Sequence, residues 1–228
     1  ESVMSKVWND KIFKHIQTHV DKSSKKLADE RGSCPDAEEY GFKERFSNKT
    51  AIAPTASISI ICGGASPGVE PVAANSYTHK TLSGSYNVRN RYLRKILEKH
   101  GKNDDETWST ITTNQGSVSH LNFLTKHEKD VFKTAFELDQ KWIIELGAER
   151  TPYVSQAQSI NIFLPADVHK KELHQIHFQA WKKGLKSLYY CRSKSIQRAE
   201  NINNGLSTNL IKNEPKKDLD YDECLSCQ

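Results

Sequence analysis

The sequence has no apolar run long enough to cross a bilayer. Its most apolar stretches, 58–62 and 160–164, are far shorter than the roughly 20 residues that a spanning helix needs. The chain begins with Glu1 and lacks the basic, apolar and small-residue succession of a secretory signal. We therefore expect no membrane span, and a sequence that starts inside a longer gene.

Cysteine is scarce and odd in number. The five cysteines are Cys34, Cys62, Cys191, Cys224 and Cys227. This is a poor disulfide framework for a chain of 228 residues, so a reducing cytoplasm is expected.

A basic block is also missing. The formal charge of +5 is dispersed and shows no aromatic-basic stripe, so nucleic-acid binding is not expected. A modest positive excess would suit an anionic nucleotide, although ordinary solvated helix faces would give the same balance.

Hydrophobic periodicity predicts an α/β protein. Strand, helix and strand near the end of the periodic region form the pattern of a parallel sheet or barrel. The predicted elements are an amphipathic helix over 2–31, a short strand over 50–53, a helix over 88–100 that Gly101 ends, a longer helix starting at Thr125, a strand over 158–164, a helix over 167–183 that Gly184 ends, and a strand over 185–191.

The helix that starts at Thr125 carries the clearest local signal. Glu128 stands three residues later and completes a capping box. The predicted buried face of this helix contains Val131, Phe132, Ala135, Phe136, Trp142, Ile143 and Leu146.

The last eighteen residues, 211–228, are mostly charged or polar and cannot bury enough surface to offset chain entropy. We divide the chain into a folded part over 1–210 and a mobile tail over 211–228. No internal repeat is visible.

A first candidate site is the small-residue turn Pro54-Thr55-Ala56-Ser57-Ile58-Ser59, followed by several glycines. If Ser57 to Cys62 opens a helix, its free amides and dipole form an anion site, with the hydroxyls of Thr55, Ser57 and Ser59 as further donors. A plain capped turn explains the same residues, since no Gly-Lys-Ser/Thr phosphate loop is present.

A second candidate is the pair Tyr189-Tyr190 at the end of a predicted strand. Adjacent strand residues point to opposite faces, and a buried tyrosine is usually core. The pair gains a function only where an electron must travel, because a phenol is easily oxidised only if its proton leaves too.

A third candidate is Cys224-Leu225-Ser226-Cys227 near the chain end. Two cysteines at this spacing can close a disulfide, and a flexible tail lets the pair travel. Half a zinc site is the competing interpretation, but no second pair of ligands with suitable spacing is evident. No metal site is assigned, His174 and His177 are assigned to a solvated helix face, and Cys34, Cys62 and Cys191 are expected to pack as small hydrophobic residues.

Together these segments resemble the large, catalytic subunit of class I ribonucleotide reductases, in its C-terminal portion and over nearly the whole chain. The motifs that carry the resemblance are Cys34-Pro35-Asp36, Ala51 to Ser59, Pro67-Gly68-Val69-Glu70-Pro71, Arg150-Thr151-Pro152-Tyr153, Gln156 to Asn161, Leu188-Tyr189-Tyr190 and the terminal Cys224 and Cys227.

The resemblance implies the later strands and helices of a ten-stranded α/β barrel, followed by the tail. It also implies that Pro54 to Ser59 binds the phosphates of a ribonucleoside diphosphate. Tyr189 and Tyr190 would relay an oxidising equivalent from a small radical-bearing subunit, and Cys224 and Cys227 would reduce the active-site disulfide and be regenerated by thioredoxin or glutaredoxin.

Several family features have no counterpart here, namely the thiyl cysteine in its finger loop, the two cysteines oxidised by substrate, the specificity site and the N-terminal ATP-binding domain. The resemblance implies a fragment that is inactive alone and binds no cofactor itself. The full enzyme would be a homodimer of large subunits, with the small subunit and ATP or deoxynucleotide effectors. A second hypothesis is a noncatalytic nucleotide- or phosphate-binding module with a redox or zinc-binding tail.

Overall fold

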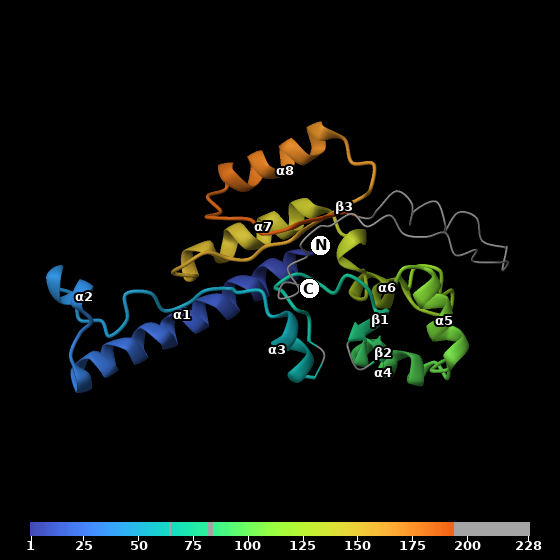
Figure 1. Cartoon of the computed structure of the whole chain (residues 1–228), viewed down its shortest axis with the longest axis horizontal. Coiled ribbons are helices and arrows are strands. Elements are labelled where there is room, and N and C mark those ends of the chain that lie inside the picture. The colour runs from blue at the N-terminus through green and yellow to red at the C-terminus, as the bar shows by residue number, and fades with distance from the viewer. Residues whose placement is uncertain (64, 82–83, 194–228) are drawn as a thin grey trace.

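The computed structural model describes residues 1–63, 65–81 and 84–193 (Figure 1). The predicted tail, with Cys224 and Cys227, therefore lies outside the described residues. The elements in chain order are α1 Val3–Arg31, α2 Pro35–Glu39, α3 Ala56–Ile61, β1 Ser76–Thr81, β2 Gly84–Arg89, α4 Arg91–Lys99, α5 Asp105–Thr113, α6 Lys126–Val131, the 3-10 turn η1 Ala135–Glu137, α7 Gln140–Arg150, the 3-10 turn η2 Thr151–Tyr153, β3 Ile162–Leu164, α8 Lys170–Lys182 and β4 Cys191–Ser193.

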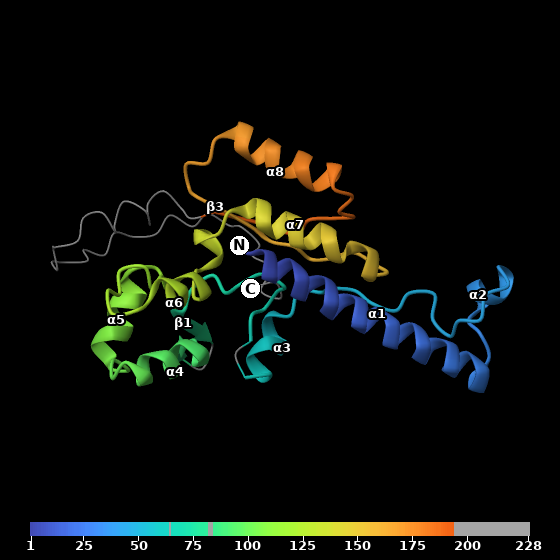
Figure 2. The same cartoon turned by 180° about the vertical axis from the view of Figure 1, so that it is seen from behind.

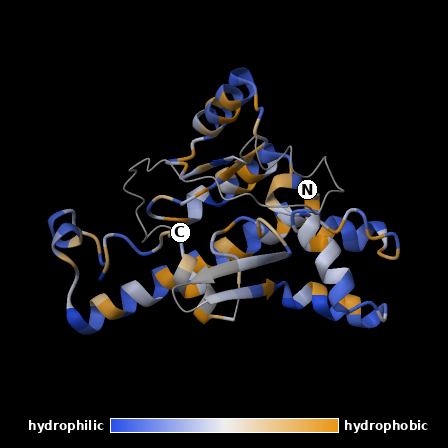
Figure 3. Ribbon diagram, turned by 45° about the vertical axis from the view of Figure 1, so that its right-hand side comes forward, coloured by the Kyte–Doolittle hydropathy of each residue, from blue (hydrophilic) through white to orange (hydrophobic). Residues whose placement is uncertain are grey.

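The predicted first helix is confirmed as α1. The Ser2 side chain caps it by accepting from the Ser5 backbone N–H, and Gly32 ends it at a φ of 81°. The helix lies along α7, as the two opposite views show (Figures 1 and 2). Hydrophobic residues recur along its length (Figure 3), yet Val3, Trp8 and Ile12 are 74%, 57% and 49% exposed. Its apolar face is therefore only partly covered by the rest of this chain.

The main core lies where α7, β3 and α8 meet. Ile144, Ile160, Ile162 and Leu164 are almost fully buried there, with Ile176 of α8 packed over them. Strands β3 and β4 pair in parallel, with Phe163 opposite Arg192. The predicted strand, helix, strand unit is confirmed, and Gly184 follows the helix at a φ of 79°.

Both strands of this unit are shorter than predicted, and the second begins only at Cys191. On the edge of β3 that faces away from β4, the backbone N–H groups bond to side chains rather than to a further strand. The Asn161 backbone N–H donates to the Glu70 carboxylate, and the Phe163 N–H donates to Gln140 Oε1 at 2.8 Å. The predicted strand over 50–53 is likewise reduced to one bridge, between Ile52 and Gln158, because Pro54 follows and has no N–H to continue a ladder.

The single long helix predicted from Thr125 is wrong, since the segment divides into α6, η1 and α7. The predicted capping box of Thr125 and Glu128 is present. Two further helix N-termini interrupt the predicted helix. Thr134 forms a second capping box with Glu137, and the Asp139 side chain caps α7 by accepting from the Lys141 N–H. Val131 is consequently 59% exposed rather than buried, whereas Phe132, Ala135 and Ile143 are buried as predicted.

The predicted helix over 88–100 begins later, as α4. Asn90 caps it by accepting from the N–H groups of Tyr92 and Leu93, so the preceding residues remain in strand β2. The antiparallel β1–β2 pair and α5 were not predicted. A second core is formed by α4, α5 and the segments on either side of α6, and it contains Leu93, Leu97, Trp108, Ile111, Val118, Leu121, Leu124 and Phe132.

The expectation that Cys34, Cys62 and Cys191 pack as small hydrophobic residues is wrong for two of the three. Cys62 and Cys191 are exposed and Cys34 is half-buried. Cys62 follows the last turn of α3, and Cys191 lies on β4, whose three residues are all exposed. Among the described helices, none combines the length and apolar character needed to span a membrane.

Candidate functional site

Helix α3 begins within the segment Pro54 to Ser59 that is predicted as an anion site. Thr55 is fixed to the opposite loop, because its backbone N–H and its hydroxyl both donate to the Pro67 carbonyl, at 2.9 and 3.0 Å. The Ser59 N–H donates to the Thr55 carbonyl at 2.8 Å. The N–H groups of residues 56–58 precede this bond, so they have no carbonyl acceptor within the helix. The predicted helix opening is confirmed, and its first amides are available to an anion.

The hydroxyls were expected to add donors, and here the structure differs. The Thr55 hydroxyl is committed to Pro67, and the Ser59 hydroxyl donates to the Ala56 carbonyl at 2.9 Å. Ser59 is also buried. Backbone amides rather than these two hydroxyls are therefore the donors that α3 offers.

A cavity of about 370 Å³ opens beside the start of α3. It brings together segments that are distant in the sequence: the predicted turn, the loop that follows α3, strand β3 and the tyrosine segment. Its lining includes Pro54, Thr55, Ala56, Ile58, Pro67, Gly68, Glu70, Asn161, Phe163, Tyr189 and Arg192. The predicted anion-binding turn and the first predicted tyrosine thus line the same space.

Tyr189 and Tyr190 lie with their rings in contact. The ring centroids are 4.1 Å apart and the planes meet at 49°. The two residues are 39% and 42% exposed, so the pair is not ordinary core. The Arg192 guanidinium lies 5.6 Å from the centre of the Tyr190 ring. Because the regular strand starts only at Cys191, the two side chains do not take the opposite faces that a strand would give them.

Two buried polar residues of the cavity were assigned no role from the sequence. Glu70 is 5% exposed and Asn161 is 9% exposed. One Glu70 carboxylate oxygen accepts from the Asn161 backbone N–H, and the other accepts from Asn161 Nδ2 at 3.4 Å. Both residues stand within the quoted motifs, but 91 positions separate them, so no local pattern indicates that they meet.

A buried arginine lies behind this pair. Arg150 is 4% exposed, and its Nε donates to Gln158 Oε1 at 2.6 Å. Burial lowers the pKa of Arg150 to about 10, while the negative charge of Glu70 acts in the opposite direction and raises it. The Glu70 carboxylate, which lines the cavity, therefore favours the charged form of the buried Arg150.

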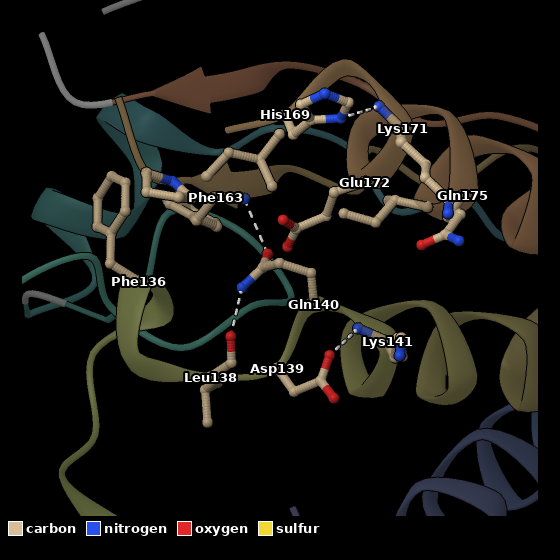
Figure 4. A pocket seen from close by; sticks show the side chains of 13 residues that line it. Phe136, Leu138, Asp139, Gln140, Lys141, Phe163, His169, Lys171, Glu172 and Gln175 are labelled. Atoms are coloured by element: carbon tan, nitrogen blue, oxygen red, sulfur yellow. Dashed lines mark hydrogen bonds between the residues drawn. The ribbon is translucent and has the colours of Figure 1, made fainter. Parts of the chain in front are cut away.

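A second cavity, of about 690 Å³, lies between α7 and α8 and is shown in Figure 4. Its buried polar residue is Gln140, which accepts from the Phe163 N–H and donates to the Leu138 carbonyl, both at 2.8 Å. Charges of both signs, including Asp139 and Lys171, line it. Because Gln140 is already paired within the chain, this cavity is the weaker candidate for a ligand site.

Within the described part of the chain, no three histidine, cysteine, aspartate or glutamate side chains are grouped so that they could hold a metal ion. His174 stacks on Phe178 with ring centroids 6.1 Å apart, and His177 Nδ1 lies 2.8 Å from the Leu173 carbonyl. These two histidines therefore have partners on their own helix.

Comparison with known proteins gives a consistent result. The family model "Ribonucleotide reductase, barrel domain" matches residues 36–191. A ribonucleoside-diphosphate reductase large subunit of Invertebrate iridescent virus 6 is 48% identical over 207 residues, covering 89% of this chain and 21% of the relative. A protein of the same name from Invertebrate iridescent virus 3 is 39% identical and covers 98% of this chain and 35% of the relative.

Among solved structures, the class Id ribonucleotide reductase alpha subunit of Actinobacillus ureae superposes with a TM-score of 0.77 at 38% identity. That match covers 85% of this chain and 35% of the other. The chain thus spans between a fifth and about a third of the length of these proteins.

Proposed function

Because the chain belongs to the ribonucleotide reductase family through its barrel domain, we propose that it forms part of a large subunit that reduces ribonucleoside diphosphates to 2′-deoxyribonucleoside diphosphates. In this proposal the chain supplies three parts of the enzyme. These are a phosphate-binding turn at Pro54 to Ser59, a radical relay at Tyr189 and Tyr190, and a shuttle dithiol at Cys224 and Cys227.

The shared cavity is the observation that carries the proposal. A diphosphate at the start of α3 would accept hydrogen bonds from the free amides of residues 56–58, and the helix dipole favours its negative charge. Arg192 lines the same cavity and adds a positive charge. Fixing the diphosphate would hold the ribose in place, which is the entropic part of catalysis.

The tyrosine relay has its own support. Two phenol rings with centroids 4.1 Å apart allow a short hop of an electron, provided that each phenol proton leaves with it. Both rings are partly exposed, so a partner protein can reach them. We propose that the small, radical-bearing subunit docks on this side, and that the oxidising equivalent then passes towards a cysteine outside this chain.

In the complete enzyme, the proposed reaction is a radical reduction of the ribose. A thiyl radical removes the 3′ hydrogen of the ribose, and the 2′ hydroxyl leaves as water. A dithiol supplies two electrons and two protons, one proton for the water and one for the 2′ carbon, and becomes a disulfide. The 3′ hydrogen then returns to the sugar, which regenerates the thiyl radical. Cys224 and Cys227 would reduce that disulfide and be reduced in turn by thioredoxin or glutaredoxin. In the same proposal the complete enzyme is a cytoplasmic homodimer that is controlled by ATP and deoxynucleotide effectors, and this chain itself binds no cofactor.

The relay is tested by Tyr189→Phe and Tyr190→Phe in a complete large subunit that carries these residues. Each variant should bind substrate as the wild type does and lose turnover by at least about a thousandfold, because a phenylalanine cannot take part in the proton-coupled hop. Tyr92→Phe, on α4, is the matched control and should keep its turnover. Near-normal turnover in either relay variant would remove Tyr189 and Tyr190 from the proposal.

A further inference from the structure

Asn161 holds an unpaired acceptor at the cavity that contains the start of α3. The residue directly precedes β3, is 9% exposed, and is one of the residues that line the cavity. Its Nδ2 donates to Glu70 Oε2 at 3.4 Å. Its Oδ1 is buried and has no hydrogen-bond partner among the residues that the structure describes. Buried acceptors of this kind are normally paired, so one at a cavity suggests a partner that comes with a ligand.

The orientation of this side chain is fixed by chemistry. An ionised carboxylate only accepts hydrogen bonds, so the amide nitrogen of Asn161 must face Glu70, and the amide oxygen must face away from it. Glu70 itself has little freedom. It is 5% exposed, and a Cβ atom added at Gly68 would overlap its carboxylate. The Glu70 and Gly68 pair therefore presents Asn161 Oδ1 in one orientation.

We propose that Asn161 Oδ1 accepts a hydrogen bond from a ribose hydroxyl of the bound ribonucleoside diphosphate. The inference rests on the proposed function, since it needs a diphosphate at the start of α3. An acceptor cannot bind the phosphate oxygens, which carry no proton at neutral pH. The donors of a nucleotide are its sugar hydroxyls and, on the base, an exocyclic amine or a ring N–H. The ribose is joined directly to the diphosphate, so it is the donor-bearing part that lies nearest to α3.

In this assignment Asn161 binds the sugar, and Glu70 is a positioning residue that acts through Asn161. The contact would let the enzyme recognise the sugar independently of the base, because every ribonucleotide offers the same hydroxyls. It would also place a fixed point on the ribose besides the diphosphate. Two fixed points define the rotation of the sugar, which a phosphate clamp alone leaves free.

The test changes the protein and the ligand separately and then together, by removing the Asn161 amide from one and a sugar hydroxyl from the other. It uses a complete large subunit that carries these residues. Dissociation constants of CDP, 2′-deoxy-CDP, 3′-deoxy-CDP and UDP are measured by calorimetry for the wild type and for Asn161→Ala. We expect the variant to bind CDP about tenfold more weakly, as for the loss of one hydrogen bond. For the analogue that lacks the partner hydroxyl, the same substitution should change the affinity by less than about twofold.

Asn87→Ala, on β2 outside the cavity, is the matched control and should leave all four constants unchanged. If Asn161→Ala does not fold, Asn161→Leu has a similar size and should give the same coupling. The inference would be overturned if Asn161→Ala weakened the binding of CDP and of both deoxy analogues equally. It would also be overturned if the effect of Asn161→Ala differed between CDP and UDP, which differ only in the base. Absence of CDP binding to the wild type would instead contradict the proposed function.

Discussion

Glu70, in the lining of the candidate site, and Arg150 carry opposite charges and are both buried. Glu70 fixes Asn161 through its backbone and its side chain, while Arg150 fixes Gln158, three positions earlier in the same segment. Buried charges contribute little net stability as a pair, but removing one partner leaves the other uncompensated. The position of the segment that leads into β3 therefore depends on both Glu70 and Arg150.

Glu70→Gln should lower the free energy of unfolding by about 1–3 kcal/mol, because it removes the buried negative charge that accepts both Asn161 hydrogen bonds and favours the charged form of Arg150. It also places an amide nitrogen against the Asn161 amide. Chemical denaturation measures the effect. The matched control is Glu145→Gln, which removes a partly exposed ion pair with Lys183 and should cost less than about 1 kcal/mol. Equal losses in the two variants would contradict the role given to Glu70.

At the scale of elements, the core between α7, β3 and α8 holds the cavity wall in place. Ile144 of α7 is fully buried there, whereas Ile12 of α1 is 49% exposed. Ile144→Ala should lower the free energy of unfolding by about 2–5 kcal/mol, since it leaves a void in packed surroundings. Ile12→Ala should change it by less than about 1 kcal/mol. Denaturation curves of the two variants measure the difference, and a larger loss for Ile12→Ala would show that α1 rather than β3 centres the core.

The capping box of α6 should make stability depend on pH. Hydrogen bonds from the Thr125 backbone N–H, His100 and the Thr125 hydroxyl lower the pKa of Glu128 to about 2, from the ordinary value of 4.5. A lowered pKa means that the stabilisation is complete above pH 4.5 and is lost as the pH falls towards 2. The difference in stability between the wild type and Glu128→Gln should therefore shrink over this range. An NMR titration of the Glu128 carboxyl group that gave an ordinary pKa would contradict the prediction.

Elements with local signals could be predicted from the sequence, and elements fixed by distant contacts could not. The Thr125 cap and the glycine that ends α8 are local, and both are confirmed. The helix breaks at Thr134 and Asp139 could not be predicted, because apolar residues continue at helical spacing across them. The same division holds for the site. The turn at Thr55 and the cavity-lining Tyr189 carry recognisable motifs, whereas Glu70 and Asn161 meet only through the fold.

At the scale of the whole molecule, the chain leaves apolar and strand surface uncovered. Much of the apolar face of α1 is exposed, and the described strands form two sheets of two strands each. Such edges and faces are normally paired or covered. This agrees with a chain that spans between a fifth and about a third of its relatives, in which the rest of the barrel would pack against it.

We predict that the 228-residue chain alone forms no deoxynucleotide from ribonucleoside diphosphates, even with a dithiol reductant and a small subunit present. The proposed relay leads to a cysteine outside these residues, so no thiyl radical can form at the sugar. Product analysis by chromatography tests this, with a complete large subunit as the positive control. Deoxynucleotide formation by the chain alone would show that it contains its own radical cysteine.

The most direct test of the account is calorimetric titration of a complete large subunit that carries these residues with CDP and with cytidine, which lacks the phosphates. Ala56→Asp places a carboxylate at the first turn of α3, whereas Ala51→Asp adds the same charge at an exposed position before it. If the start of α3 binds the diphosphate, Ala56→Asp should weaken the binding of CDP at least about tenfold through charge repulsion. The binding of cytidine should stay unchanged. Ala51→Asp should change neither. CDP binding that is unaffected by Ala56→Asp would contradict the central claim.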